Sequence, residues 1–93
     1  METLIIDGMR CENREQLHEM LSQSPLFPPY YGRNLDALHD VLSACATPLL
    51  IRVLSPDVVV RHLGRYGEIM LMLLRDAASE NPKITLEMMG EAT

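Results

Sequence analysis

Two aspartates, a histidine and a serine occur within one short segment of the chain. Asp36 and Asp40 are four residues apart, and His39 and Ser43 fall on the same stripe if the segment is helical. Paired carboxylates beside an imidazole can serve acid–base catalysis, and the same groups can bind a cationic partner through charge-assisted hydrogen bonds. An acidic stripe can also be an ordinary solvated helix face, and Asp36 gains stabilisation from a position in a first helical turn. These residue types therefore leave an enzyme, a binding surface and a solvated face as alternatives.

Catalysis receives the least support from the surrounding sequence. Active sites are usually concave, whereas this stripe should face outward on a helix whose other side carries Leu35, Leu38, Val41 and Leu42. The chain contains no glycine-rich phosphate loop, nucleophile elbow or metal-ligand motif. The isolated candidates for metal or redox chemistry are Cys11, Cys45, His18 and His62. We expect no enzymatic activity, cofactor or metal site, two reduced thiols, and both of these histidines at helix surfaces or at the edge of the core.

A proline-rich segment with two adjacent tyrosines precedes the acidic stripe. Prolines and a glycine between residues 22 and 33 predict a stiff, irregular loop. Tyr30, Tyr31 and Gly32 stand near its end. Tyrosine is a stiff, amphipathic side chain that is enriched at interface hot spots. We expect one tyrosine to pack inward and the other to face outward, which favours a binding surface over a solvated face.

Hydrophobic periodicity and capping signals predict the elements that position these residues. Asn13 and Asn34 are typical helix N-caps. Ser55 is predicted to cap a further helix that ends at Gly64. The nearly continuous apolar run at 49–54 is typical of a strand buried on both faces of a parallel sheet. The predicted strands are 3–6, 49–54 and 83–88, and the predicted helices are 14–22, 35–44, 56–63 and 66–79. Helical connections imply right-handed crossovers, and so an α/β fold with a three-stranded parallel sheet and about four helices.

Length and charge limit the remaining possibilities. A chain of 93 residues with 47% hydrophobic content is expected to form a single domain over residues 1–93. It lacks the ~18-residue apolar run of a membrane span and the features of a secretory signal, so we expect a cytoplasmic protein without membrane contact. Nothing in the sequence requires more than a monomer. The net charge of −5 disfavours direct nucleic-acid binding and favours a basic protein partner.

The stretch PYYGRNLDALHDVL at 29–42 closely resembles the nuclease-binding segment of the barstar family. The match includes residues 30–32 (Tyr-Tyr-Gly), residues 34–38 (Asn-Leu-Asp-Ala-Leu) and Asp40, and it continues more weakly, for example at 75–77 (Arg-Asp-Ala). Proteins of this family are intracellular inhibitors of barnase-type secreted ribonucleases. The resemblance implies a three-stranded parallel sheet with flanking helices, in agreement with the fold class above.

In this family the loop and the helix block the active site of the enzyme, and the resemblance implies a role for each matching residue. Tyr30 matches a tyrosine that packs against the nuclease, and Asp40 matches the aspartate that enters the phosphate-binding pocket. Further contacts are implied for Asn34, Asp36, Asp76 and Glu80. Adjoining residues complete the predicted partner-binding face: Tyr31, Gly32, His39 and Ser43.

Four residues depart from the family pattern within or beside this segment. Arg33 replaces a glutamate, and a cation beside the acidic stripe would weaken attraction to a basic nuclease. His39 and Ala44 each stand where the family has a tryptophan, and Ser43 replaces a threonine. The sequence predicts an immunity-type inhibitor of a basic extracellular-type ribonuclease or toxin nuclease domain. The alternative is a barstar-like interaction module with a non-nuclease partner.

Overall fold

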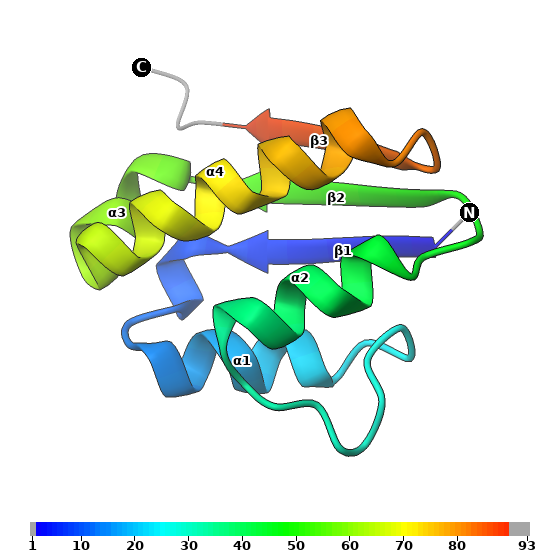
Figure 1. Ribbon diagram of the computed structural model, residues 1–93. Coiled ribbons are helices and arrows are strands. Elements are labelled where there is room, and N and C mark those ends of the chain that lie inside the picture. The colour runs from blue at the N-terminus through cyan, green and yellow to red at the C-terminus, as the bar shows by residue number, and fades with distance from the viewer. Residues whose placement is uncertain (1, 90–93) are drawn as a thin grey trace.

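Strands and helices alternate along the chain in the computed structural model, which describes residues 2–89 (Figure 1). The elements are β1 (Glu2–Asp7), the 3₁₀ helix η1 (Gly8–Arg10), α1 (Arg14–Ser22), α2 (Leu35–Ser43), β2 (Leu49–Leu54), α3 (Pro56–Leu63), α4 (Arg65–Glu80) and β3 (Ile84–Met89). The strands form one parallel sheet in the order β1-β2-β3, which confirms the predicted α/β fold. Residue 1 and residues 90–93 of the predicted domain lie outside the described part. No helix within that part is long and apolar enough to cross a bilayer.

The central strand is buried on one face only, so the predicted burial on both faces is wrong. The inward residues of β2 are fully buried: Leu49, Ile51 and Val53. In Figure 1, α4 and α2 lie in front of the sheet, and α1 lies beside α2 on the β1 side. The alternate residues are only partly buried, and among them Arg52 forms a 3.0 Å ion pair with Glu87, its register partner on β3. Charged groups need water or a partner, and Arg52 within the apolar run was the sequence signal for this second, solvated face.

Asparagine caps begin α1 and α2, as predicted. Asn13 Oδ1 accepts a hydrogen bond from the backbone N–H of Gln16 at 2.8 Å. The Gln16 side chain reaches back to the backbone N–H of Glu12 at 2.8 Å, one residue before the cap. Asn34 Oδ1 accepts from the N–H of Ala37 at 2.7 Å at the start of α2. These bonds satisfy donors that a helix start leaves unpaired, and they fix where each helix begins.

Ser55 begins α3 without the predicted side-chain cap. Its backbone lies in the left-handed region at φ 53°, and its side chain makes no capping hydrogen bond, while Pro56 takes the first helical position. The Ser55 N–H instead donates to the Met89 carbonyl at 3.0 Å, and the Ser55 carbonyl accepts from the N–H of Val58 at 2.9 Å. Bonds to two elements therefore hold this strained residue in place. The predicted helix end at Gly64 is confirmed, with φ +61° in the region that favours glycine.

The apolar side of α2 fixes this helix against the core. Leu38 and Leu42 are fully buried, and the other apolar residues of the helix are partly buried against the same core. Beyond the end of α4, Asn81 Nδ2 donates to the carbonyls of Leu42 at 3.1 Å and Cys45 at 2.9 Å. Burial of one leucine side chain contributes about 1.5–3 kcal/mol. Packing and these bonds together hold α2 in one orientation, with its opposite side toward solvent.

Both cysteines are buried free thiols. Burial and, to a smaller extent, Asp7 raise the pKa of Cys11 to about 11, against an opposing effect of Arg10. The thiolate is the reactive form of cysteine. Cys11 is therefore protonated and unreactive near neutral pH.

Candidate protein-binding face

The predicted acidic stripe of α2 lies on the surface of the protein. Asp36, His39, Asp40 and Ser43 are all exposed, and the Asp40 side chain retains 86% of its accessible surface. His39 Nδ1 lies 4.0 Å from Asp40 Oδ1 and 3.5 Å from Ser43 Oγ. Contacts of this length are weak or are not hydrogen bonds, so the stripe keeps most of its hydrogen-bonding capacity for a partner.

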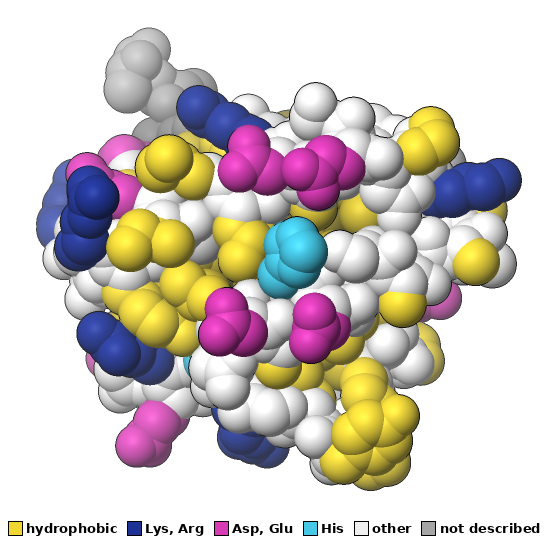
Figure 2. All heavy atoms as spheres, viewed as in Figure 1, with side chains coloured by type: hydrophobic (Ala, Val, Ile, Leu, Met, Phe, Trp, Pro, Cys, Tyr) yellow, Lys and Arg dark blue, Asp and Glu magenta, His cyan; other side chains and the backbone are white. Residues whose placement is uncertain are grey.

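Helix α4 brings a second pair of carboxylates beside the stripe. Asp76 and Glu80 are exposed on α4, which packs against α2. Both line a hollow of about 280 Å³ together with His39. Figure 2 shows acidic side chains on two sides of a histidine on this surface. Residues from two distant segments are thereby gathered on one surface, which we name the acidic face: Asp36, His39, Asp40, Asp76 and Glu80.

The four carboxylates of the acidic face form no ion pair with an arginine among the described residues, although Arg65 lines the same hollow as Asp76 and Glu80. Within residues 2–89, the carboxylates that pair with arginine lie elsewhere: Glu19, Asp57, Glu68 and Glu87. Asp36 and Asp40 stand four residues apart on one helix, where like charges cost about 0.2–0.5 kcal/mol. The free protein carries this small cost, and a cationic partner would remove it.

The two tyrosines take opposite orientations, as expected. Tyr30 is 85% exposed and lines a groove together with Asp40. Tyr31 is only 8% exposed and packs edge-on against Phe27, with 4.8 Å between ring centroids. Its backbone N–H donates to the Pro28 carbonyl at 3.0 Å. Tyr30 is therefore available as an anchor, whereas Tyr31, also predicted to contact a partner, lies inside and supports the loop.

Gly32 and Asn34 shape the turn from the loop into α2. A Cβ atom at Gly32 would lie 3.2 Å from the Cβ atom of Ala37, so glycine lets the loop lie close against the helix. Asn34 caps the helix through Oδ1, and its Nδ2 donates to the Gly32 carbonyl at 3.3 Å. Both residues are exposed. A partner would meet an Asn34 side chain whose orientation is already fixed.

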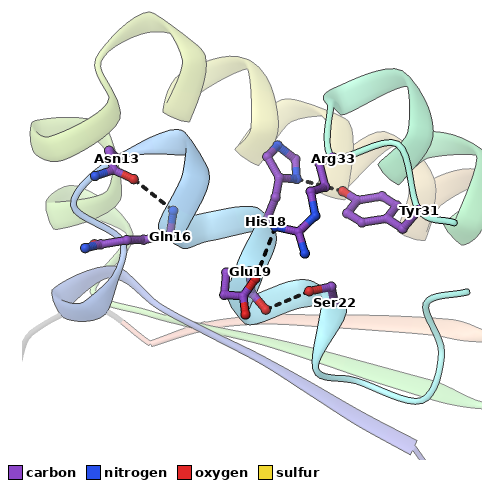
Figure 3. A network of polar contacts seen from close by, with 7 residues as sticks. All are labelled: Asn13, Gln16, His18, Glu19, Ser22, Tyr31 and Arg33. Carbon is purple, nitrogen blue, oxygen red and sulfur yellow. Dashed lines mark hydrogen bonds and ion pairs between the residues drawn. The ribbon is translucent and has the colours of Figure 1, made fainter. Parts of the chain in front are cut away.

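A buried histidine, His18, ties this loop to the core. His18 is 2% exposed, so it lies inside the protein, not at a helix surface or the edge of the core as expected. Its Nδ1 lies 2.8 Å from the Tyr31 hydroxyl, and its Nε2 lies 2.7 Å from the Tyr66 hydroxyl. Figure 3 marks the contact with Tyr31 by a dashed line. The Tyr31 hydroxyl also lies 3.5 Å from the Asn34 carbonyl. One side chain therefore connects α1, α4 and the start of α2.

Burial sets the protonation states of this network. Burial lowers the pKa of His18, and the Arg33 charge lowers it further. Burial is also the main cause that raises the pKa values of Tyr31 and Tyr66. A neutral imidazole has one donor and one acceptor nitrogen, and each can pair with one protonated hydroxyl. Both ring nitrogens are then satisfied, as buried polar groups require, so the network braces the structure and leaves no group free for acid–base chemistry.

Arg33 was expected to place a positive charge beside the acidic stripe, but the structure turns its side chain elsewhere. Its side chain extends toward α1, where Nη1 lies 3.1 Å from Glu19 Oε2 (Figure 3). The backbone at Arg33 has a positive φ of 57°, which the periodicity of the sequence does not reveal. The guanidinium is paired with Glu19. The departure of Arg33 from the family pattern therefore does not neutralise the carboxylates of the acidic face.

The remaining histidine and the carboxylates offer no evident metal site. His62 is exposed on α3, as expected, and its Nδ1 lies 3.2 Å from the Cys11 carbonyl. Among residues 2–89, no three His, Cys, Asp or Glu side chains lie close enough together to hold a metal ion. The carboxylates of the acidic face are spread over two helices and face solvent, an arrangement suited to a cationic protein surface.

Comparison with known proteins agrees with this fold. The family model described as Barstar (barnase inhibitor) matches residues 1–89. A protein of Bacillus subtilis (strain 168) that is named "Putative ribonuclease inhibitor YrdF" is 40% identical over 81 residues. The match covers 86% of this chain and 89% of that protein. The family match includes both helices of the acidic face and the loop before them.

Proposed function

The chain belongs to the barstar family, and we propose that it binds a small basic ribonuclease and blocks its active site. The enzyme would be of the barnase kind, either free or as the nuclease domain of a toxin. The single observation that supports this most is the acidic face, whose four carboxylates are exposed and unpaired with arginine. The family model is described as a barnase inhibitor, in keeping with a binding role for the acidic face.

The mechanism is substitution of a carboxylate for a phosphate. A ribonuclease holds the phosphates of RNA with cationic side chains, and a carboxylate placed among them makes charge-assisted hydrogen bonds of the same kind. Asp40 is the best placed group, because it is exposed on a helix that Leu38 and Leu42 hold rigidly. Because the helix backbone is fixed before binding, only the Asp40 side chain must be ordered, which keeps the loss of conformational entropy small. Asp36, Asp76 and Glu80 would meet cations around the rim.

Long-range electrostatics would speed the encounter. The chain carries a net charge of −5, and part of it is concentrated on the acidic face. Complementary charge raises the association rate, and salt reduces this effect because the Debye length is about 10 Å at 0.1 M. The same charge repels RNA itself. A basic nuclease is therefore favoured over nucleic acid as the partner, and the name of the Bacillus subtilis relative, a putative ribonuclease inhibitor, supports this choice.

A second candidate is a barstar-like interaction module with a non-nuclease partner. The exposed His39 at the centre of the acidic face favours it, because the family pattern has a tryptophan there. Aromatic side chains are frequent binding anchors, so their replacement changes which partners fit. The two candidates differ in one observable result, namely whether a ribonuclease loses activity when bound.

The test measures binding to immobilised barnase by surface plasmon resonance. Asp40→Ala should weaken binding by about 3–5 kcal/mol, the usual cost of leaving a buried charge without its partner. Glu15→Ala is the matched control, because it removes the same charge from an exposed position on α1 outside the acidic face. Its effect should stay within about twofold. Equal losses for both variants, or no binding by the wild-type protein, would contradict the proposal.

A further inference from the structure

The exposed side of α4 changes its chemical character along the helix. Arg65 lies at its start and Asp76 near its end, and both are exposed. Between them stand two large apolar side chains, Ile69 with 41% and Met72 with 59% exposure. Spacings of four, three and four residues place the four side chains on one side of the helix. We name this row the α4 stripe: Arg65, Ile69, Met72 and Asp76.

The α4 stripe has no strong partner among residues 2–89. All four side chains line the hollow of about 280 Å³ beside His39. Arg65 Nη1 lies 3.6 Å from Glu68 Oε1, a surface pair of little stabilising effect, and Asp76 forms no ion pair within the described chain. Figure 2 shows hydrophobic side chains gathered to the left of the histidine, with Lys or Arg side chains at the left edge and acidic side chains to the right. An exposed apolar patch with a charged rim is typical of an interaction site.

We propose that the α4 stripe pairs with the α4 stripe of a second copy of this chain, as two antiparallel helices. A two-fold axis between positions 70 and 71 places Ile69 of one copy opposite Met72 of the other, and Arg65 opposite Asp76. The symmetry repeats each contact, so two apolar contacts lie at the centre and one ion pair lies at each end. Packed helices stand 8–10 Å apart, within reach of these long side chains. The stripe is therefore complementary to its own reverse.

The order of charges favours a second copy over other occupants. Arg65 and Asp76 stand about 16 Å apart along the helix, at a rise of 1.5 Å per residue. A second copy presents the opposite charges at the same separation, so both ends are satisfied in one register. Nucleic acid and an anionic membrane would be repelled by Asp76 and the adjoining Glu80. A uniformly basic surface would be repelled by Arg65.

Pairing of the α4 stripes would cover Asp76, which also belongs to the acidic face. Self-association and binding of a basic ribonuclease would therefore exclude each other. This consequence rests on the proposed function, whereas the dimer does not. A single helix pair is at the small end of interface sizes, so we expect a dissociation constant on the order of 100 μM. A tight inhibitor complex would displace such a dimer, which would form only at high concentration of the free protein.

The experiment is sedimentation velocity of the protein alone, from low micromolar to near-millimolar concentration. The wild-type protein should change from monomer to dimer across this range. Arg65→Glu and Asp76→Arg each place like charges at both ends of the pair, so either change should weaken the dimer by about tenfold or more. Arg10→Glu is the matched control, because it makes the same charge reversal at an exposed position of η1. Its effect should stay within about twofold.

An equimolar mixture of the Arg65→Glu and Asp76→Arg proteins tests the antiparallel register. Each end of the mixed dimer again joins a cation and a carboxylate, so association should return to within about threefold of the wild-type value. Thermal melts confirm that each variant is folded. Absence of barnase binding would contradict the proposed function and leave the dimer standing, because sedimentation involves no nuclease. A wild-type monomer at every concentration, equal losses for Arg10→Glu and Arg65→Glu, or a mixture that stays monomeric would overturn the dimer.

Discussion

His18 and His39 both lie near oxygen-bearing side chains, but the two regions differ in almost every other respect. His18 is buried, and each ring nitrogen has a tyrosine hydroxyl within 2.8 Å. His39 is about half-exposed, and its contacts to Asp40 and Ser43 are 3.5 Å or longer. Polar groups that are buried and fully paired have nothing left to offer a partner, whereas exposed groups with long contacts do. Burial and hydrogen bonding therefore distinguish the His18 network, which stabilises the fold, from the acidic face, which is exposed to a partner.

Replacing each histidine by alanine should give the largest difference in the free energy of unfolding between the two regions. His18→Ala leaves a cavity and two tyrosine hydroxyls without their partner, so the free energy of unfolding should fall by about 2–4 kcal/mol. His39→Ala removes an exposed side chain, and the change should stay within about 0.5 kcal/mol. Urea denaturation followed by circular dichroism measures both. Similar losses for the two variants would show that burial does not distinguish the regions.

The adjacent tyrosines allow a matched test of one hydroxyl group. Tyr31→Phe leaves a His18 nitrogen unpaired in the core, and the free energy of unfolding should fall by about 1–3 kcal/mol. Tyr30→Phe removes a hydroxyl that faces solvent, so the same quantity should change by less than about 0.5 kcal/mol. Denaturant unfolding again gives both values. The comparison fails if Tyr30→Phe is the more destabilising change.

The pH dependence of stability should sharpen the contrast by a smaller amount. Burial, and then Arg33, lower the pKa of His18 in the folded protein, so the unfolded chain binds this proton more readily. The stability that neutral His18 contributes is complete above the unfolded pKa of about 6.5, and it is lost as pH falls through the lower folded pKa.

The measurement is the free energy of unfolding at pH values from about 7 downward. His18→Gln should show a weaker decline below pH 6.5 than the wild-type protein, because glutamine does not titrate in this range. His39→Gln is the control, since it removes an exposed histidine and leaves the buried network in place. An unchanged decline in His18→Gln would contradict the role given to burial.

Local patterns in the sequence predicted much of the fold, because capping residues and hydrophobic periodicity determine where the helices lie and which of their sides is buried. Asparagine caps and apolar periodicity predicted the positions of α1 and α2 and the outward orientation of the acidic stripe. The approach of α4, which adds Asp76 and Glu80 beside His39, was expected only through the family resemblance. The composition of a segment does not reveal which distant helix will pack beside it.

Three of the errors share one physical cause. His18 meets hydroxyls that are 13 and 48 residues away in the chain, so nothing in its own segment reveals that it is buried and paired. Arg33 was assigned to the stripe because it is adjacent in sequence, but a positive φ and a pair with Glu19 turn it to α1. Ser55 looked like a cap from its residue type, and its backbone conformation depends on a bond to β3. Tertiary contacts decided each case.

Competition for the nuclease active site tests the central claim most directly. A fluorescent RNA oligonucleotide is bound to catalytically inactive barnase, and this protein is titrated into the complex while fluorescence anisotropy is followed. If the acidic face occupies the phosphate-binding site, one equivalent of the wild-type protein should release all of the RNA, and Asp40→Ala should require a large excess. A stable ternary complex, with the RNA still bound at saturating inhibitor, would contradict the claim.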